Sequence, residues 1–264
     1  MKTLRYLLAT LVMVASLSAS AQWTPTKKVL DIATPKMKVF LPKDELNNGR
    51  AIVACPGGSY LGHAVGHEGW DWAPYFNKQG ITYIVLEYAL PAGDRTKPIG
   101  DAEAALKIVR DSAEVWHVNP ADIGIMGSSA GGHLASTIAT HSAPDVRPAF
   151  QILFYPVISM DAELGHVLTH DNFLGKDASA ELVEEYSNDK QVTKDTPRAI
   201  ILCSDDDMVN PATNAAPYYI ALHQAGVPAA LHIYPTGEHG WGILNSFQHH
   251  TQMLDDLSAW LATF

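Results

Sequence analysis

Hydrophobic and polar positions along the chain alternate between two kinds of segment. Short apolar runs rich in Val, Ile and Ala are typical of buried strands, whereas apolar residues spaced three and four apart are typical of helices. Strand-like runs occur at 37–41, 50–55, 81–86, 123–126, 149–155, 198–202 and 229–234, and helical spacing at 70–79, 101–118, 130–141, 214–225 and 248–264. This alternation predicts one α/β domain with a mostly parallel sheet.

One interval, 159–196, interrupts the alternation. It has no strand pattern and carries nine acidic residues against three lysines. We expect an excursion of the chain over the edge of the sheet. Because a lid for long-chain lipids needs an apolar face, this polar segment argues against such lipids as substrates.

The first 21 residues have the pattern of a secretory signal peptide. Lys2 and Arg5 precede an apolar run at 7–17, and Ala19–Ser20–Ala21 forms a small-residue cleavage site. The run is too short to span a bilayer comfortably. We therefore expect cleavage before Gln22, a single catalytic domain at 22–264, a secreted or periplasmic location, and no membrane attachment after cleavage.

Charge narrows the range of partners. The chain has 18 basic and 28 acidic side chains, which gives a formal net charge of −10 at pH 7. A surface of this sign repels nucleic acid and anionic lipid, so we expect neither as a partner. A small-molecule or oligosaccharide substrate remains open, and the sequence makes no prediction of the oligomeric state.

The stretch at 123–134, IGIMGSSAGGHL, joins a predicted strand to a predicted helix through a sharp turn. Gly127, Ser129 and Gly131 fit the GxSxG pattern of a nucleophile elbow, in which glycines remove side chains that would collide with the neighbouring strand or helix. By itself, the pattern is also compatible with a glycine turn that has no catalytic role. Partner residues must decide between the two interpretations.

An acid and a histidine follow two later strands in the order that this elbow requires. Asp205, Asp206 and Asp207 follow the strand at 198–202, and His239 follows the strand at 229–234. Since all these groups lie at carboxyl ends of parallel strands, they meet at one edge of the sheet. We predict Ser129 as nucleophile, His239 as base and Asp207 as the orienting acid, with Asp206 as the second candidate.

A glycine-containing turn after the strand at 50–55 completes the predicted site. The backbone amides of Gly58 or Ser59, together with that of Ala130 at the start of the elbow helix, are positioned to form an oxyanion hole. Tyr60 directly follows this turn, and Trp241 follows His239 by two positions. Their aromatic faces suit a sugar or feruloyl ring. We predict that these two residues form part of the substrate-pocket wall.

Several stretches together resemble the acetyl esterase and acetylxylan esterase group of secreted α/β-hydrolases. They are CPGGSYLG, HEGWDWA, GITYIVLEYALP, IGIMGSSAGGHLAST, SDDDMVNPATN and YYIALHQAGVPAALHIYPTGEHGWG. The resemblance implies an eight-stranded, mostly parallel sheet flanked by helices, and the roles given above for Ser129, an acid at 205–207 and His239. The sequence departs from that group at Ser59, where a third glycine is usual, and at Ala89, where arginine is common.

The strand order of that group also bears on the two cysteines, Cys55 and Cys203. It separates their strands by three positions, which is too far for a disulfide. We therefore expect two free, buried thiols.

These features predict a secreted serine carboxylesterase that removes acetyl groups from acetylxylan or its oligosaccharides, without a metal or other cofactor. A feruloyl esterase and a serine peptidase of the same fold are the alternatives among enzymes. A catalytically silent carbohydrate-binding homologue is the alternative that is not an enzyme.

Overall fold

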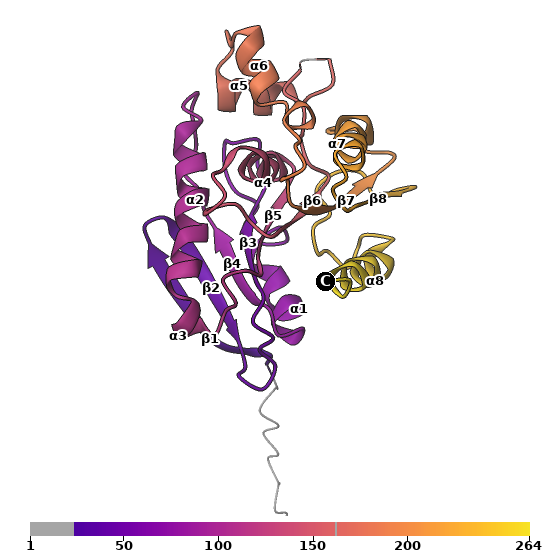
Figure 1. Cartoon of the computed structure of the whole chain (residues 1–264). Helices are drawn as coiled ribbons and strands as arrows, with labels where there is room; N and C mark the ends of the chain where they lie inside the picture. Colours follow the sequence, from indigo (N-terminus) through magenta and orange to yellow (C-terminus); the bar gives the residue numbers. More distant parts are fainter. Residues whose placement is uncertain (1–23, 162) are drawn as a thin grey trace, which may run out of the picture.

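The computed structural model describes residues 24–161 and 163–264, so the predicted signal peptide lies outside the described residues. Eight strands form one sheet in the order β1-β2-β4-β3-β5-β6-β7-β8 (Figure 1). β2 runs antiparallel to both of its neighbours, and all the remaining pairs are parallel. The strands are β1 (Thr26–Ala33), β2 (Lys36–Pro42), β3 (Ala51–Cys55), β4 (Thr82–Leu86), β5 (Ile123–Ser128), β6 (Phe150–Phe154), β7 (Arg198–Ser204) and β8 (Ala229–Tyr234). The predicted fold class is confirmed.

Helices cover both faces of the sheet, and each face has its own apolar core. One core packs α2 (Thr96–Asp111), α3 (Ala113–Trp116), α4 (Ala130–His141) and α7 (Ala212–Gln224) against the sheet. The other core packs η1 (Trp70–Trp72), α1 (Ala73–Lys78) and α8 (His250–Leu261) on the opposite face (Figure 1). The strands β3 to β6 are buried throughout, as their continuous apolar runs predict.

The edge strand β1 is the one strand missing from the sequence prediction. Its residues are exposed or half-buried, and only Leu30 and Ile32 pack against the core. They alternate with exposed neighbours, which is the period-two pattern of a strand with one covered face. Only two of its apolar residues pack on the core, and the neighbouring Val29 is exposed, so the alternation is weak in the sequence.

Register brings the four loops of the predicted site together. Cys55 of β3 pairs with Gly127 of β5, so the glycine-containing turn after β3 begins beside the elbow after β5. Ser204 of β7 pairs with Tyr234 of β8, so the loops that carry the three aspartates and the histidine begin side by side. All four loops leave the sheet at its carboxyl edge, where ligands bind in open α/β sheets.

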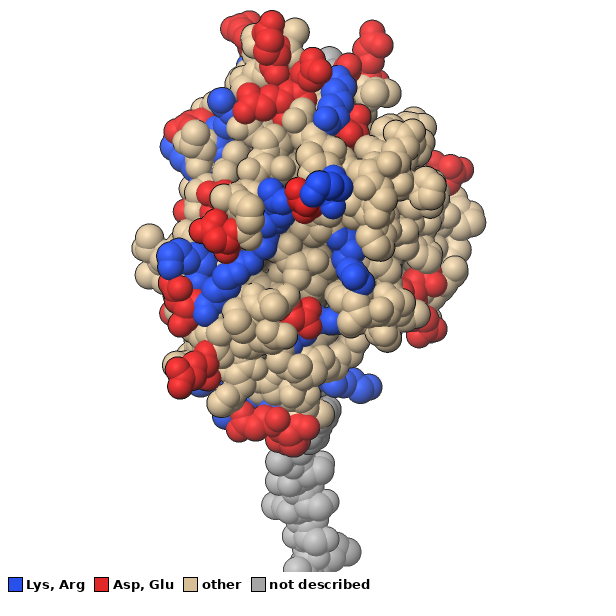
Figure 2. Space-filling view, in the orientation of Figure 1, with Lys and Arg blue, Asp and Glu red and all other residues tan. Residues whose placement is uncertain are grey.

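The described residues of the excursion at 159–196 contain no strand, and Asn172 reaches the turn after β3 at the carboxyl edge of the sheet. The excursion forms α5 (Val167–Leu174), α6 (Ala180–Glu185) and η2 (Asn188–Lys190), and it lies against α4. Asn188 donates to the His133 carbonyl oxygen at 3.3 Å and to the Ser136 hydroxyl at 2.8 Å, and Phe173, Leu174 and Tyr186 join the apolar core on the same face. Figure 2 shows acidic side chains gathered at the end of the molecule where α5 and α6 lie.

Both cysteines are free and buried, as predicted, with β5 and β6 lying between their strands. Burial raises the pKa of the Cys203 thiol to about 12. Within the described part of the chain, no helix has both the length and the apolar character needed to cross a membrane.

Candidate active site

Ser129 lies in the tight turn between β5 and α4, with a backbone φ of +52°. A Cβ on Gly127 would overlap the carbonyl oxygen of Gly131, and a Cβ on Gly131 would overlap that of Cys55. Only glycine fits at both positions, which is the steric requirement of a nucleophile elbow. The left-handed conformation of Ser129 is the kind of backbone strain that functional sites store.

His239 joins Ser129 to Asp207. Its Nε2 lies 2.9 Å from the Ser129 hydroxyl oxygen, and its Nδ1 lies 2.6 Å from Asp207 Oδ2. The other carboxylate oxygen of Asp207 accepts backbone N–H groups of Val209 and Asn210, at 2.9 and 2.8 Å. An acceptor of this kind places the imidazole hydrogen on Nδ1, which leaves Nε2 free to accept the serine proton.

The three consecutive aspartates have three different environments. Asp207 is buried and contacts His239. Asp206 instead accepts the backbone N–H groups of Gly237, at 3.2 Å, and Glu238, at 2.8 Å, so it holds the loop that carries the histidine. Asp205 is exposed. Of the two candidates left open by the sequence, Asp207 is the one that reaches the imidazole.

The turn at 57–59 presents backbone N–H groups beside Ser129. Gly58 has a φ of +138° and Ser59 a φ of +54°, and within the described residues neither N–H group donates to another protein atom. Ala130 begins α4, where the first N–H groups have no partner inside the helix. The structure thus brings the three predicted oxyanion residues to the same edge as the serine, and their role in catalysis stays a prediction.

Tyr60 does not line a pocket, and this prediction is wrong. Tyr60 has a backbone φ of +59°, and it is only 1% exposed. The ring stacks on Phe173 of α5 with a centroid separation of 4.8 Å, and the hydroxyl lies 3.0 Å from His133 Nδ1.

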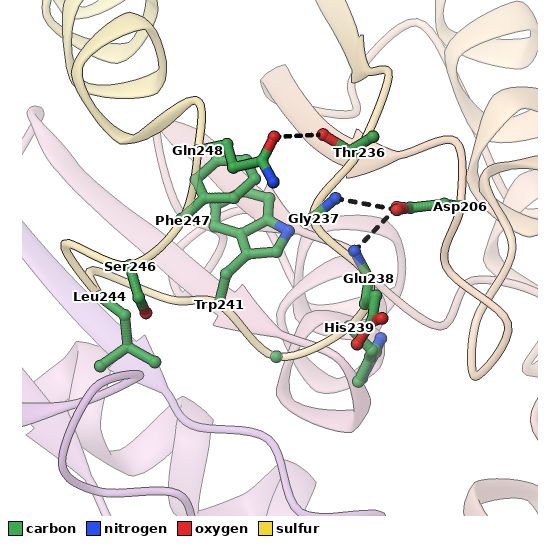
Figure 3. Close-up of a pocket in the computed structure, with 11 residues that line it drawn as sticks. Asp206, Thr236, Gly237, Glu238, His239, Trp241, Leu244, Ser246, Phe247 and Gln248 are labelled. Carbon is green, nitrogen blue, oxygen red and sulfur yellow. Dashed lines mark hydrogen bonds between the residues drawn. The ribbon is translucent and has the colours of Figure 1, made fainter.

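Trp241 borders a hollow of about 370 Å³ beside His239 (Figure 3). Its ring lies almost parallel to that of Phe247, at 4.1 Å, and its Nε1–H donates to the Ser204 hydroxyl. Only 4% of the residue is exposed, so most of the indole is core. The other side chains of the hollow are His239, the polar Asp206, Thr236, Glu238, Ser246 and Gln248, and the apolar Leu244 and Phe247.

Two supporting residues were missed by sequence reasoning. Glu68 is buried below the turn at 57–59 and accepts the Gly57 N–H at 2.7 Å. Asn172 of α5 donates to the carbonyl oxygen of Ser59 at 2.9 Å. Neither had a signal in the sequence, since Glu68 lies in the polar and aromatic stretch HEGWDWA beside another acid, Asp71. Among the described residues, no group of three or more His, Cys, Asp or Glu side chains could hold a metal ion.

Comparison with known proteins identifies the family of the chain. The sequence profile of the alpha/beta hydrolase fold family matches residues 57–243, and the chain belongs to this family. It is 48% identical over 240 residues to an acetylxylan esterase of Xylanibacter ruminicola, a match that covers 89% of this chain and 50% of that protein. It is 28% identical over 226 residues to endo-1,4-beta-xylanase B of Butyrivibrio fibrisolvens, covering 80% of this chain and 35% of the relative.

Among solved structures, the chain is similar to an acetyl ester-xyloside bifunctional hydrolase from Caldicellulosiruptor lactoaceticus. The TM-score is 0.82 at 28% identity, and the match covers 92% of this chain and 98% of the other. The chain spans half the length or less of the two curated relatives given above.

Proposed function

We propose that the chain is a serine carboxylesterase that removes acetyl groups from xylan or xylan-derived oligosaccharides. The observation that carries the proposal is the continuous contact from Ser129 through His239 to Asp207, with distances of 2.9 and 2.6 Å. The 48% identity to an acetylxylan esterase supports the acyl group and the glycan.

The proposed reaction proceeds in two halves. Ser129 Oγ attacks the ester carbonyl carbon while its proton moves to His239 Nε2, and the carbonyl oxygen becomes an oxyanion near the N–H groups of Gly58, Ser59 and Ala130. Collapse of this intermediate breaks the bond to the sugar oxygen, which takes the proton from His239. Water then attacks the acetyl-serine by the same route, which releases acetate and restores the serine.

Burial of the aromatic residues supports acetyl over feruloyl as the acyl group. A feruloyl ring needs an aromatic or apolar surface to lie against. Tyr60 and Trp241, the aromatic residues expected near the pocket, are 1% and 4% exposed. A small acyl group makes no such demand.

The polar hollow beside His239 supports a sugar as the leaving group. His239 returns its proton to the leaving oxygen, so the alcohol half of the substrate lies on the histidine side. Hydroxyl, amide and carboxylate side chains border this hollow (Figure 3). These groups can donate to and accept from sugar hydroxyls.

A substrate panel tests the proposed function. We expect cleavage of p-nitrophenyl acetate in preference to the butyrate, octanoate and methyl ferulate esters, together with release of acetate from acetylated xylan. Preference for octanoate would contradict a carbohydrate esterase, and preference for methyl ferulate would favour a feruloyl esterase. Binding of acetylated xylan without hydrolysis of any ester would instead support a non-catalytic carbohydrate-binding protein.

We also propose that the protein is exported and cleaved before Gln22, on the basis of the charged and apolar pattern of residues 1–21. N-terminal sequencing of the protein recovered from the periplasm or medium tests this directly. A protein that retains Met1 and stays in the cytoplasm would contradict it.

A further inference from the structure

Glu68 is a buried acid in the loop between β3 and η1. It is 4% exposed, and none of the ion pairs found in residues 24–161 and 163–264 includes it. Burying a carboxylate without a cation is costly unless hydrogen bonds compensate. Such a group calls for an explanation, and the proposed reaction steps do not use it.

Two hydrogen bonds compensate the Glu68 carboxylate. Oε2 accepts the backbone N–H of Gly57 at 2.7 Å, and Oε1 accepts the hydroxyl of Tyr155 at 2.8 Å. The hydroxyl oxygen of Tyr155 in turn accepts the backbone N–H of Gly242 at 2.9 Å. Because the N–H of Gly242 can only donate, the Tyr155 hydroxyl hydrogen points to Glu68, and both carboxylate oxygens act as acceptors.

One end of this network reaches the turn that presents the oxyanion donors. Gly57 immediately precedes Gly58 and Ser59, and a Cβ built on Gly57 would lie 2.7 Å from Glu68 Oε2 and 2.9 Å from Ser129 Cβ. Glu68 therefore lies directly behind the nucleophile. Its bond to the Gly57 N–H fixes the start of the turn, and hence the direction of the N–H groups that follow.

The other end of the network reaches the catalytic histidine. Tyr155 is fully buried, and its ring packs edge-on against the His239 imidazole at a centroid separation of 4.8 Å. Gly242, which donates to the Tyr155 hydroxyl, lies in the same loop as His239. Glu68 thus joins the oxyanion turn to the histidine loop through one side chain.

We propose that Glu68 is a positioning residue for the ester hydrolysis proposed above. Its carboxylate holds the Gly57–Ser59 turn and, through Tyr155, the His239 loop at the separation that the tetrahedral intermediate requires. A displacement of about 1 Å in such groups can cost about a hundredfold in rate. This role rests on the proposed esterase function and predicts loss of transition-state stabilisation rather than of substrate affinity.

Glu68→Gln and Tyr155→Phe test the two arms of the network. The amide of glutamine has one acceptor oxygen, so it can accept from Gly57 or from Tyr155 but not from both in the wild-type manner. Phenylalanine keeps the ring against His239 and removes the link to Glu68 and Gly242. Since both changes act on the same hydrogen-bond network, the losses should be non-additive, and the double variant should lose less than the product of the two single losses.

Tyr218→Phe is the matched control. Tyr218 is fully buried in α7, and its hydroxyl donates to Gln151 Oε1 at 3.0 Å. The change removes a buried tyrosine hydroxyl bond that has no contact with the site. Comparison of melting temperatures separates loss of stability from loss of positioning.

The measurements are kcat and KM on p-nitrophenyl acetate, and the inhibition constant of a trifluoromethyl ketone whose adduct with serine carries an oxyanion. We expect Glu68→Gln and Tyr155→Phe to lower kcat about tenfold or more, to change KM little, and to raise the inhibition constant in parallel with the fall in kcat/KM. Tyr218→Phe should retain wild-type kcat.

Two other outcomes would overturn the proposal in different ways. Wild-type kcat and inhibition constants in Glu68→Gln, or losses confined to KM or melting temperature, would show that Glu68 has no positioning role, while esterase activity in the wild type would leave the proposed function intact. If the wild type itself hydrolysed no ester, the proposed function would fall and this role with it.

Discussion

The side-chain amide of Asn172 donates a hydrogen bond of 2.9 Å to the carbonyl oxygen of Ser59, although 113 positions separate the two residues. Ser59 has a φ of +54°, a conformation that is strained for a residue with a side chain. The neighbouring Phe173 stacks on Tyr60. The segment at 159–196 therefore contacts the turn at 57–60, whose N–H groups are the predicted oxyanion donors.

Asn172→Ala should weaken catalysis without loss of folding. One neutral hydrogen bond contributes about 1 kcal/mol. If all of this free energy stabilises the transition state, its loss lowers kcat about fivefold. Gln191→Ala is the control, since Gln191 Nε2 donates to the Glu184 carbonyl oxygen at 2.9 Å in the same segment but has no contact with the turn. Equal kcat values for the two variants on p-nitrophenyl acetate would contradict a role for Asn172.

Asp207→Asn and Asp206→Asn should differ strongly in their effects on kcat. An amide at position 207 can no longer fix the hydrogen on His239 Nδ1, and we expect a loss of about 10⁴-fold, as for the corresponding change in other serine hydrolases. Asp206→Asn keeps an oxygen that can accept a backbone N–H from the histidine loop, so its loss should be about tenfold or less.

Steady-state kinetics with p-nitrophenyl acetate separate the two aspartates. Melting temperatures of both variants serve as the control for folding. The reverse order, with Asp206→Asn the more damaging change, would assign the orienting acid to Asp206.

His133 gives the folded state a pH dependence of its own. Its Nε2 lies 2.9 Å from the Tyr186 carbonyl oxygen and must carry the hydrogen, so Nδ1 accepts the hydroxyl of Tyr60 at 3.0 Å. The ring is fully buried. Burial lowers the pKa of this imidazole to about 3 in the folded state.

This shift predicts lower stability in acid. Below about pH 6.5 the unfolded chain takes up a proton at His133 that the folded chain does not bind, so the free energy of unfolding falls as the pH falls toward 3. Between pH 7 and 5 the contribution is about 2 kcal/mol. His133→Gln, which can accept from Tyr60 and donate to Tyr186, should lack this contribution in urea denaturation at the two pH values. If the free energy of unfolding of the wild type and of His133→Gln changed equally with pH, the assignment of this contribution to His133 would be contradicted.

Local sequence predicts those parts of the site that depend on one turn or one strand end. The elbow follows from the steric requirement at Gly127 and Gly131. His239 and the acidic turn at 205–207 follow from their places after two predicted strands. These features need only the nearest neighbours along the chain and the rule that parallel strands end at one edge.

Features that depend on packing between distant segments were not predictable. The burial of Tyr60 depends on Phe173 and His133, which approach from α5 and α4. The packing of the excursion on α4 depends on contacts such as those of Asn188 with His133 and Ser136. The proposed role of Glu68 depends on its hydrogen bonds to Gly57 and Tyr155, and Tyr155 lies 87 positions away in the sequence. No local pattern encodes such contacts.

The most direct test compares acetate release from acetylated xylo-oligosaccharides by the wild-type protein and by Ser129→Ala. If Ser129 is the nucleophile of a serine esterase, the wild type releases acetate and the variant loses about 10⁴-fold or more of the rate, with an unchanged melting temperature. Equal rates of release by the two proteins would contradict the assignment of Ser129. Absence of release by both would contradict the esterase function itself.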